Sequence, residues 1–162
     1  MRQSHGGRPF EPQHHPPDVS DHVPSGEKAL VVAPGSGTVP WVVARVLVLD
    51  DDVEIARMVA RVVELLGHTP LVETSSVEAV IKHGRTGLDA AIVDLMMPRL
   101  DGLEVLAQLQ ESQPATRRIL LTAAPTERSV RDALTSGLVQ LLVAKPPTLS
   151  DLQLALAWLP VG

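Results

Sequence analysis

The sequence predicts an α/β fold in which a five-stranded parallel sheet carries helices on both faces. From residue 42 on, five short apolar segments alternate with five segments of helical periodicity, and this alternation favours parallel strands joined by helices. Right-handed crossovers leave few topologies for five such units, and the flavodoxin-like strand order 2-1-3-4-5 suits them best. Apolar residues make up 44% of the 162-residue chain and aromatic residues only 2%, which predicts an aliphatic core.

The first 41 residues are predicted to be a disordered extension, and residues 42–162 to form the folded domain. Residues 1–40 contain seven of the 14 prolines and four of the six histidines. A segment of this composition cannot bury enough apolar area to offset the entropy of ordering its backbone. The histidines, including His14 and His15, lack the fixed spacing of a metal site, so we interpret them as part of a solvated tail.

Short apolar segments mark the five strands, and three of them end in an acidic residue. They are predicted at residues 45–50, 69–73, 88–94, 117–122 and 141–144. Strands buried on both faces are continuously apolar in this way.

Apolar periodicity and capping residues mark the helices between the strands. The first follows the stripe Ile55, Met58, Val59, Val62 and Leu66. Gly67 then ends this helix. The next three are predicted over residues 76–83, 101–110 and 127–136. Asp101 is the expected N-cap of the third helix, and Ser150 or Asp151 that of the last, which runs to Leu159.

Polar residues follow the ends of four of the five strands. They are Asp50, Asp51, Asp52, Asp94, Thr122 and Lys145. Because ligands bind beyond the carboxyl ends of the strands in such sheets, we expect these side chains to share one rim. Crowded carboxylates resist ionisation unless a cation lies among them, and Mg²⁺ prefers oxygen ligands. A carboxylate can attack phosphorus to form an acyl phosphate, while a lysine and a threonine hydroxyl can stabilise phosphoryl oxygens.

Each of these residues also has a simpler explanation. Asp52 can be the N-cap of the following helix, and Thr122 can cap the following turn. A lysine before proline is often part of a solvated loop. The combination, in this order and at strand ends, favours a phosphoryl site over a set of unrelated caps.

Residues 45–159 resemble a response-regulator receiver domain of two-component signalling. The stretch VLVLDDD is similar to the family's first strand with its acidic pair, here Asp50 and Asp51. AIVDLMMPRLDGLEVL is similar to the strand, loop and helix around the phosphoacceptor, here Asp94. ILLTAA and VAKPP resemble the fourth and fifth strands with their hydroxyl and Lys-Pro.

The resemblance implies a role for each matching residue. Asp94 accepts the phosphoryl group. Asp51, Asp94 and the backbone carbonyl of Met96 bind Mg²⁺, and Asp50 acts through water or by shaping the site. Thr122 contacts a phosphoryl oxygen, and Lys145 pairs with Asp94 or its phosphate.

The segment before and after the lysine departs from the family pattern. Pro146 matches the family and is expected to hold the loop through a cis bond preceding it. Leu142 stands at the switch position, where receivers often carry an aromatic residue, and the chain has no tyrosine. Pro147 replaces a frequent phenylalanine. These departures leave the predicted pocket complete. They change the residues that would pass the signal from the pocket to the surface.

The function expected from this resemblance is a cytoplasmic, single-domain phosphorelay switch. A histidine kinase or histidine phosphotransfer protein donates the phosphoryl group, and the domain is no enzyme beyond its own phosphotransfer and dephosphorylation. Only three residues follow Leu159, so we expect the signal to pass by protein contact to a downstream partner. The net charge of −5 and the lack of a long apolar run indicate neither a nucleic-acid nor a membrane partner. The absence of cysteine fits a cytosolic setting.

Two apolar residues of the last helix suggest where contact occurs. Leu154 and Trp158 lie off the core stripe and four residues apart, so they face the same side. We expect them to belong to a docking or homodimer surface formed by the fourth helix, fifth strand and fifth helix. The simpler interpretation is that they are two scattered surface residues.

Two other functions remain open on the sequence. One is a receiver-like interaction module that is never phosphorylated, although the complete set of pocket residues argues against it. The other is a phosphatase of the haloacid-dehalogenase class, whose nucleophile and second acid would be Asp50 and Asp52. Such enzymes need a further acidic pair beyond the lysine, and past Lys145 the only acid is Asp151.

Overall fold

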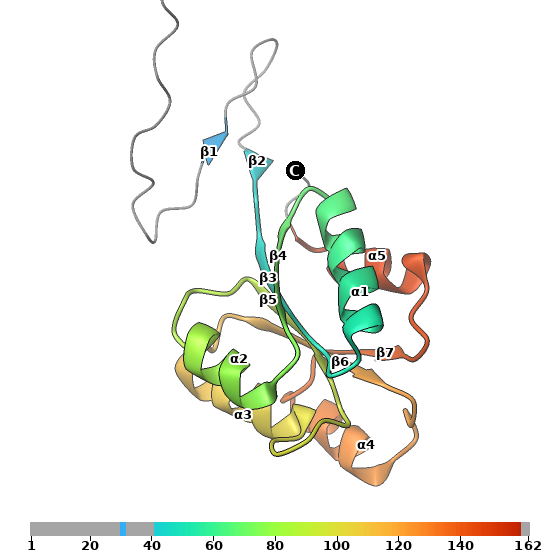
Figure 1. Ribbon diagram of the computed structural model, residues 1–162. Helices are drawn as coiled ribbons and strands as arrows, with labels where there is room; N and C mark the ends of the chain where they lie inside the picture. The colour runs from blue at the N-terminus through green and yellow to red at the C-terminus, as the bar shows by residue number, and fades with distance from the viewer. Residues whose placement is uncertain (1–29, 32–40, 160–162) are drawn as a thin grey trace, which may run out of the picture.

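A computed structural model describes residues 30–31 and 41–159. The predicted disorder of residues 1–41 falls almost entirely outside these residues and stays a prediction. Inside them, β1 (Leu30–Val31) and β2 (Trp41–Val42) form a short antiparallel pair that precedes the main sheet (Figure 1).

The main sheet has five parallel strands in the order β4-β3-β5-β6-β7. The strands are β3 (Arg45–Leu49), β4 (Thr69–Glu73), β5 (Ala90–Asp94), β6 (Arg117–Thr122) and β7 (Leu141–Ala144). Counted from β3 along the chain, this is the order 2-1-3-4-5, so the predicted fold class is confirmed.

Within residues 41–159, five helices cover the two faces of the sheet (Figure 1). They are α1 (Val53–Leu65), α2 (Ser76–His83), α3 (Gly102–Ser112), α4 (Arg128–Thr135) and α5 (Leu149–Leu156). Helices α1 and α5 pack on one face, and α2, α3 and α4 on the other.

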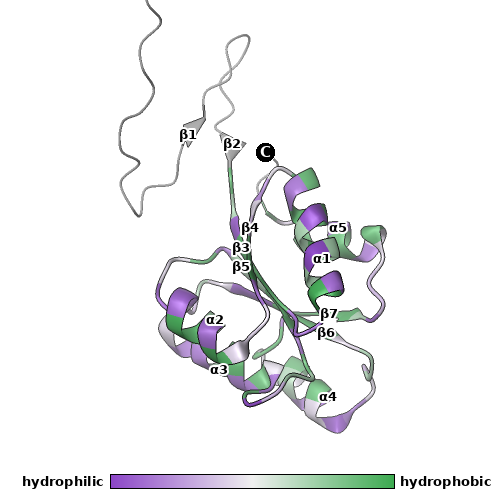
Figure 2. Ribbon diagram, viewed as in Figure 1, coloured by the Kyte–Doolittle hydropathy of each residue, from purple (hydrophilic) through white to green (hydrophobic). Residues whose placement is uncertain are grey.

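The core consists of aliphatic side chains that alternate between the two faces of the central strands. On β3, Val46 and Val48 contact the α1/α5 side, whereas Leu47 and Leu49 contact the α2/α3/α4 side. This alternation follows from the two-residue repeat of a strand. Figure 2 shows the central strands as apolar and the outer faces of the helices as mixed. The sheet therefore has two aliphatic cores, one beneath each helix layer.

Two details of the helices differ from the sequence prediction. On α1, Met58 is 37% exposed, while Ala56, Ala60 and Val63 are buried. The other four residues of the predicted stripe, Ile55, Val59, Val62 and Leu66, are in or against the core, so the buried face is the predicted one with the alanines added and Met58 at its edge. Gly67, at φ 81°, ends this helix as predicted.

The last helix also begins differently from the prediction. Its N-cap is Thr148, and neither Ser150 nor Asp151 takes that place. Asp151 lies three residues after the cap and bonds back to Thr148 in a capping box. The helix ends at Leu156 and not at Leu159, although Leu159 still packs in the core at 3% exposure.

Candidate functional site

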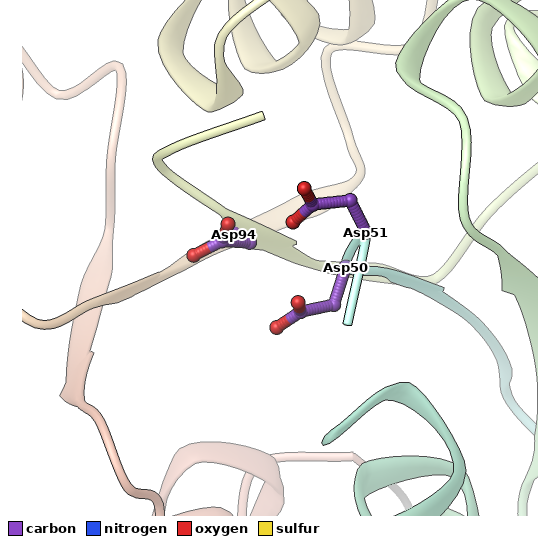
Figure 3. A group of neighbouring side chains, drawn as sticks. All are labelled: Asp50, Asp51 and Asp94. Carbon is purple, nitrogen blue, oxygen red and sulfur yellow. The ribbon is translucent and has the colours of Figure 1, made fainter. Parts of the chain in front are cut away.

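Two neighbouring strands bring acidic side chains together at the carboxyl end of the sheet. β3 and β5 pair up to Leu49 and Val93, so the residues that come next, Asp50 and Asp94, lie side by side. Both are almost fully buried, at 0% and 3% exposure. Asp51 is exposed, and its carboxylate turns toward the same space (Figure 3). One oxygen from each of the three carboxylates lies within 4.8 Å of the others.

Lys145 enters the same space from the end of β7. Its Nζ lies 2.7 Å from Oδ2 of Asp50 and 2.8 Å from Oδ1 of Asp94. The Lys145 amide donates to the Thr122 carbonyl at 2.8 Å, which fixes the start of its loop. The Lys145–Pro146 peptide is cis, as expected from the sequence. One ammonium therefore bridges two buried carboxylates on neighbouring strands.

The shared ammonium and the burial have opposing effects on ionisation. Burial raises the pKa of Asp94, Lys145 opposes this, and the charges of Asp50 and Asp51 add to the rise. Burial lowers the pKa of Lys145, but its contacts with Asp50 and Asp94 outweigh this and leave the pKa raised. Lys145 thus stays charged, and Asp94 ionises less readily than an exposed aspartate.

The donor set fits a hard divalent cation. Three carboxylates and one ammonium leave an excess of negative charge, and every donor atom is oxygen, which Mg²⁺ prefers. Asp51 and Asp94 are the residues that would hold the ion, with Asp50 beside them. No contact in the structure tests the predicted role of the Met96 carbonyl, whose residue is 73% exposed.

Thr122 and Leu142 lie on the two strands beyond Asp94. Thr122 is buried at 1% exposure, and its Oγ1 accepts a hydrogen bond from the Ala124 amide at 2.9 Å. It thus caps the following turn, one of the two predicted roles, while its hydroxyl hydrogen can still be donated. Leu142 is half-buried and packs against the core on the α2/α3/α4 side. Its role as a switch stays a prediction.

Gly102 is a site residue that the sequence analysis did not single out. A Cβ at this position would lie 2.2 Å from the backbone oxygen of Asp94. The Gly102 amide donates to the Leu95 carbonyl at 2.9 Å. Only glycine allows α3 to begin this close to the phosphoacceptor strand. The LDG stretch of the sequence contains a signal for this role. Its Asp101 is predicted as an N-cap, whereas Gly102 was assigned no role from the sequence.

Two residues of the predicted contact surface lie at the end of the chain. Leu154 is 76% exposed and Trp158 is 39% exposed. The Trp158 indole donates to the Ala155 carbonyl at 2.7 Å, and the Arg117 guanidinium lies 4.8 Å from the centre of its ring. Trp158 is therefore held against the domain, whereas the Leu154 side chain is largely exposed, and their role in a docking or homodimer surface stays a prediction.

Comparison with known proteins places residues 46–157 in one family. These residues match the model of the response regulator receiver domain. Over 108 residues the chain is 32% identical to the transcriptional regulatory protein TrcR of Mycobacterium tuberculosis. The matched segment covers 67% of this chain and 42% of that protein. It is 29% identical over 100 residues to the chemotaxis protein CheY of Listeria monocytogenes, covering 61% of this chain and 84% of that protein.

A solved structure shows the same fold. A CheY-like response regulator receiver domain protein from Methanospirillum hungatei superimposes with a TM-score of 0.66 at 20% identity, over 71% of this chain and 91% of that one. The chain thus spans less than half the length of TrcR and most of the length of the CheY-like proteins. Among the described residues, no helix has the length and apolarity to cross a bilayer.

Proposed function

Because this chain belongs to the response regulator receiver domain family, we propose that it is a switch that accepts a phosphoryl group on Asp94. The donor is a histidine kinase or a histidine phosphotransfer protein. One observation carries the proposal: the Lys145 ammonium lies 2.8 Å from Asp94 and 2.7 Å from Asp50, with Asp51 at the same opening. These residues offer a nucleophile, a fixed positive charge and a set of metal ligands in one place.

The chemical step follows from this arrangement. An oxygen of Asp94 attacks the phosphorus of a phosphohistidine, and a P–O bond forms as the P–N bond breaks. The electron pair of the broken bond stays on the imidazole nitrogen. Lys145 moves its contact from the Asp94 carboxylate to a new phosphoryl oxygen, while Asp50 keeps the ammonium in place. Transfer of this kind depends mainly on positioning and charge stabilisation.

Mg²⁺ would complete the pocket. Held by Asp51 and Asp94, and by the Met96 carbonyl, it would neutralise the phosphoryl oxygens. Asp50, beside these ligands, would keep its contact with Lys145.

The output is a change of surface and not a reaction on another substrate. Thr122 donates its hydroxyl hydrogen to the phosphoryl oxygen, and the neighbouring loops follow. In this proposal the protein works in the cytoplasm as a regulator. It signals by contact with a downstream protein, and catalyses only its own phosphorylation and dephosphorylation.

Incubation with Mg²⁺ and phosphoramidate tests the proposal directly. We expect the intact protein to gain the mass of one phosphoryl group, which alkali removes and acid does not. Asp94→Asn should abolish the gain. Asp52→Asn is the matched control, since Asp52 caps α1 through the Glu54 amide at 2.9 Å and asparagine caps equally well.

Two outcomes would contradict the proposal. Wild-type protein that never gains the phosphoryl mass would behave as an unphosphorylated interaction module. A phosphoryl group that persists in Asp94→Asn and disappears in Asp50→Asn would indicate the nucleophile of the phosphatase alternative.

A further inference from the structure

The loop between Asp94 and α3 contains a tight turn that its own residues do not favour. Arg99 lies at φ 74°, in the left-handed region that a side chain disfavours. The Leu100 amide donates to the Pro98 carbonyl at 3.1 Å across this residue, so the turn has only three residues. A strained turn of this kind persists only where the surrounding structure holds it.

A serine from a different part of the chain holds both sides of this turn. Ser76, the first residue of α2, is 2% exposed. Its Oγ donates to the Pro98 carbonyl at 3.0 Å and accepts from the Leu100 amide at 3.4 Å. A hydroxyl has one hydrogen to donate and lone pairs to accept. One buried hydroxyl therefore bonds to the residues immediately before and after Arg99.

Helix α2 does not need this hydroxyl for its own stability. The N-cap is Ser75, whose Oγ accepts from the Glu78 amide at 3.4 Å. Within the helix, alanine would be more favourable than serine at residue 76. The bonds of Ser76 go instead to a loop 22 and 24 residues away along the chain.

The turn belongs to the segment that follows the phosphoacceptor. This segment is closed at one end by the bond from the Gly102 amide to the Leu95 carbonyl and held at the other by Ser76. Met96 and Met97 lie between these two attachments. On the basis of the function proposed above, we infer that Ser76 is a positioning residue for the phosphorylation site. It fixes the backbone that follows Asp94, including the Met96 carbonyl that would face the metal.

Hydrogen exchange of the full-length protein tests whether Ser76 holds the turn. Ser76→Ala should speed exchange of the Leu100 amide by about tenfold, the effect of losing one hydrogen bond. Ser75→Ala is the matched control, because it removes the neighbouring hydroxyl and weakens α2 without touching the loop. It should leave exchange at Leu100 within about twofold of wild type.

The phosphorylation rate with Mg²⁺ and phosphoramidate tests whether the hydrogen bonds of Ser76 to the turn affect phosphorylation of Asp94. Ser76→Ala should be slower by several-fold, and Ser75→Ala should match wild type. The added change Arg99→Gly should restore much of the lost rate, since glycine adopts a positive φ without strain and needs no hydroxyl to keep the turn. If Ser76→Ala lowered the rate only by unfolding the protein, the added change Arg99→Gly would not restore it.

Three results would overturn the inference. They are unchanged Leu100 exchange and phosphorylation in Ser76→Ala, an equal defect in Ser75→Ala, and a failure of Arg99→Gly to restore the rate. If wild-type protein takes up no phosphoryl group at all, the proposed function fails, whereas exchange at Leu100 still decides whether Ser76 holds the turn.

Discussion

The two ends of the sheet provide different partners for a buried cation. At the carboxyl end, one ammonium on Lys145 is shared by the carboxylates of Asp50 and Asp94. At the amino end, Arg118 is 4% exposed, and its guanidinium donates to backbone carbonyls. Its four acceptors belong to Leu138 at 2.7 Å, Thr116 at 2.9 Å, Gly137 at 3.2 Å and Pro114 at 3.4 Å.

The two ends therefore differ in whether the partners of the buried cation can change. Backbone carbonyls have positions set by the fold, so Arg118 joins the loop after α4 to the start of β6. A carboxylate can give up its ammonium to a phosphoryl oxygen without unfolding anything. The amino end thus supports stability, and the carboxyl end keeps charges that can be rearranged.

Removing the cation of the amino end should produce the largest loss of stability. Arg118→Met keeps the apolar stem and leaves buried carbonyls without their donor. We expect the free energy of unfolding to fall by about 3 kcal/mol, measured by urea denaturation.

An exposed arginine gives the matched control for this change. The side chain of Arg128 on α4 is 90% exposed and lies 3.7 Å from Asp132. Arg128→Met should change stability by less than about 0.5 kcal/mol. Equal effects of the two variants would mean that the carbonyl contacts of Arg118 contribute nothing.

Removing a charge from the carboxyl end should have the opposite sign. Burial raises the pKa of Asp94 in the folded protein, so the unfolded chain loses this proton at a lower pH than the folded one. Stability therefore falls as pH rises through this range, and at pH 7 the ionised Asp94 opposes folding. Without Mg²⁺, Asp94→Asn should raise the free energy of unfolding by about 1 kcal/mol.

The control for this stabilisation is an exposed aspartate. Asp132→Asn, on a side chain that is 72% exposed, should have almost no effect. A less stable Asp94→Asn protein would show that the contact with Lys145 outweighs the burial of the carboxylate.

The smallest effect is expected from His68 at the amino end. The residue is 7% exposed, and the Nδ1 of its ring accepts from the Ala44 amide at 3.4 Å. Burial lowers the pKa of His68, although Asp89 partly opposes this. The unfolded chain thus takes up the proton first, and stability is lost as pH falls below the ordinary histidine value of about 6.5.

This loss can be separated from the titration of other groups by one substitution. Between pH 7.5 and pH 5.5, wild-type protein should lose up to about 1 kcal/mol more than His68→Asn, whose side-chain oxygen can still accept from Ala44. Identical pH profiles would show that His68 is protonated without cost in the folded state.

The sequence predicted the carboxyl end far better than the amino end, for a physical reason. Parallel strands bring their carboxyl ends to one edge, so the positions of Asp50, Asp94 and Lys145 in the chain were enough to place them together. At the amino end, Arg118 bonds to carbonyls of the loop after α4 and of the segment before β6, and no residue type or spacing marks a backbone carbonyl as a partner. The same limit applies to Ser76 at the carboxyl end, which bonds to the Pro98 carbonyl.

Local details were missed where one residue could take several roles. Asp151 has the side chain of an N-cap and yet is the partner of Thr148, the true cap. Met58 fits the apolar stripe of α1 but is 37% exposed, whereas Ala56 and Ala60 beside the stripe are buried. The helix and most of its buried face were predictable, because Ile55, Val59, Val62 and Leu66 all pack in or against the core.

Chemical trapping of the acyl phosphate tests the central claim most directly. Protein phosphorylated with Mg²⁺ and phosphoramidate is reduced with borohydride, which converts an aspartyl phosphate to homoserine, and its peptides are then sequenced by mass spectrometry. The account predicts homoserine at residue 94 and unchanged aspartate at residues 50, 51 and 52. Homoserine at residue 50, or at none of these positions, would contradict it.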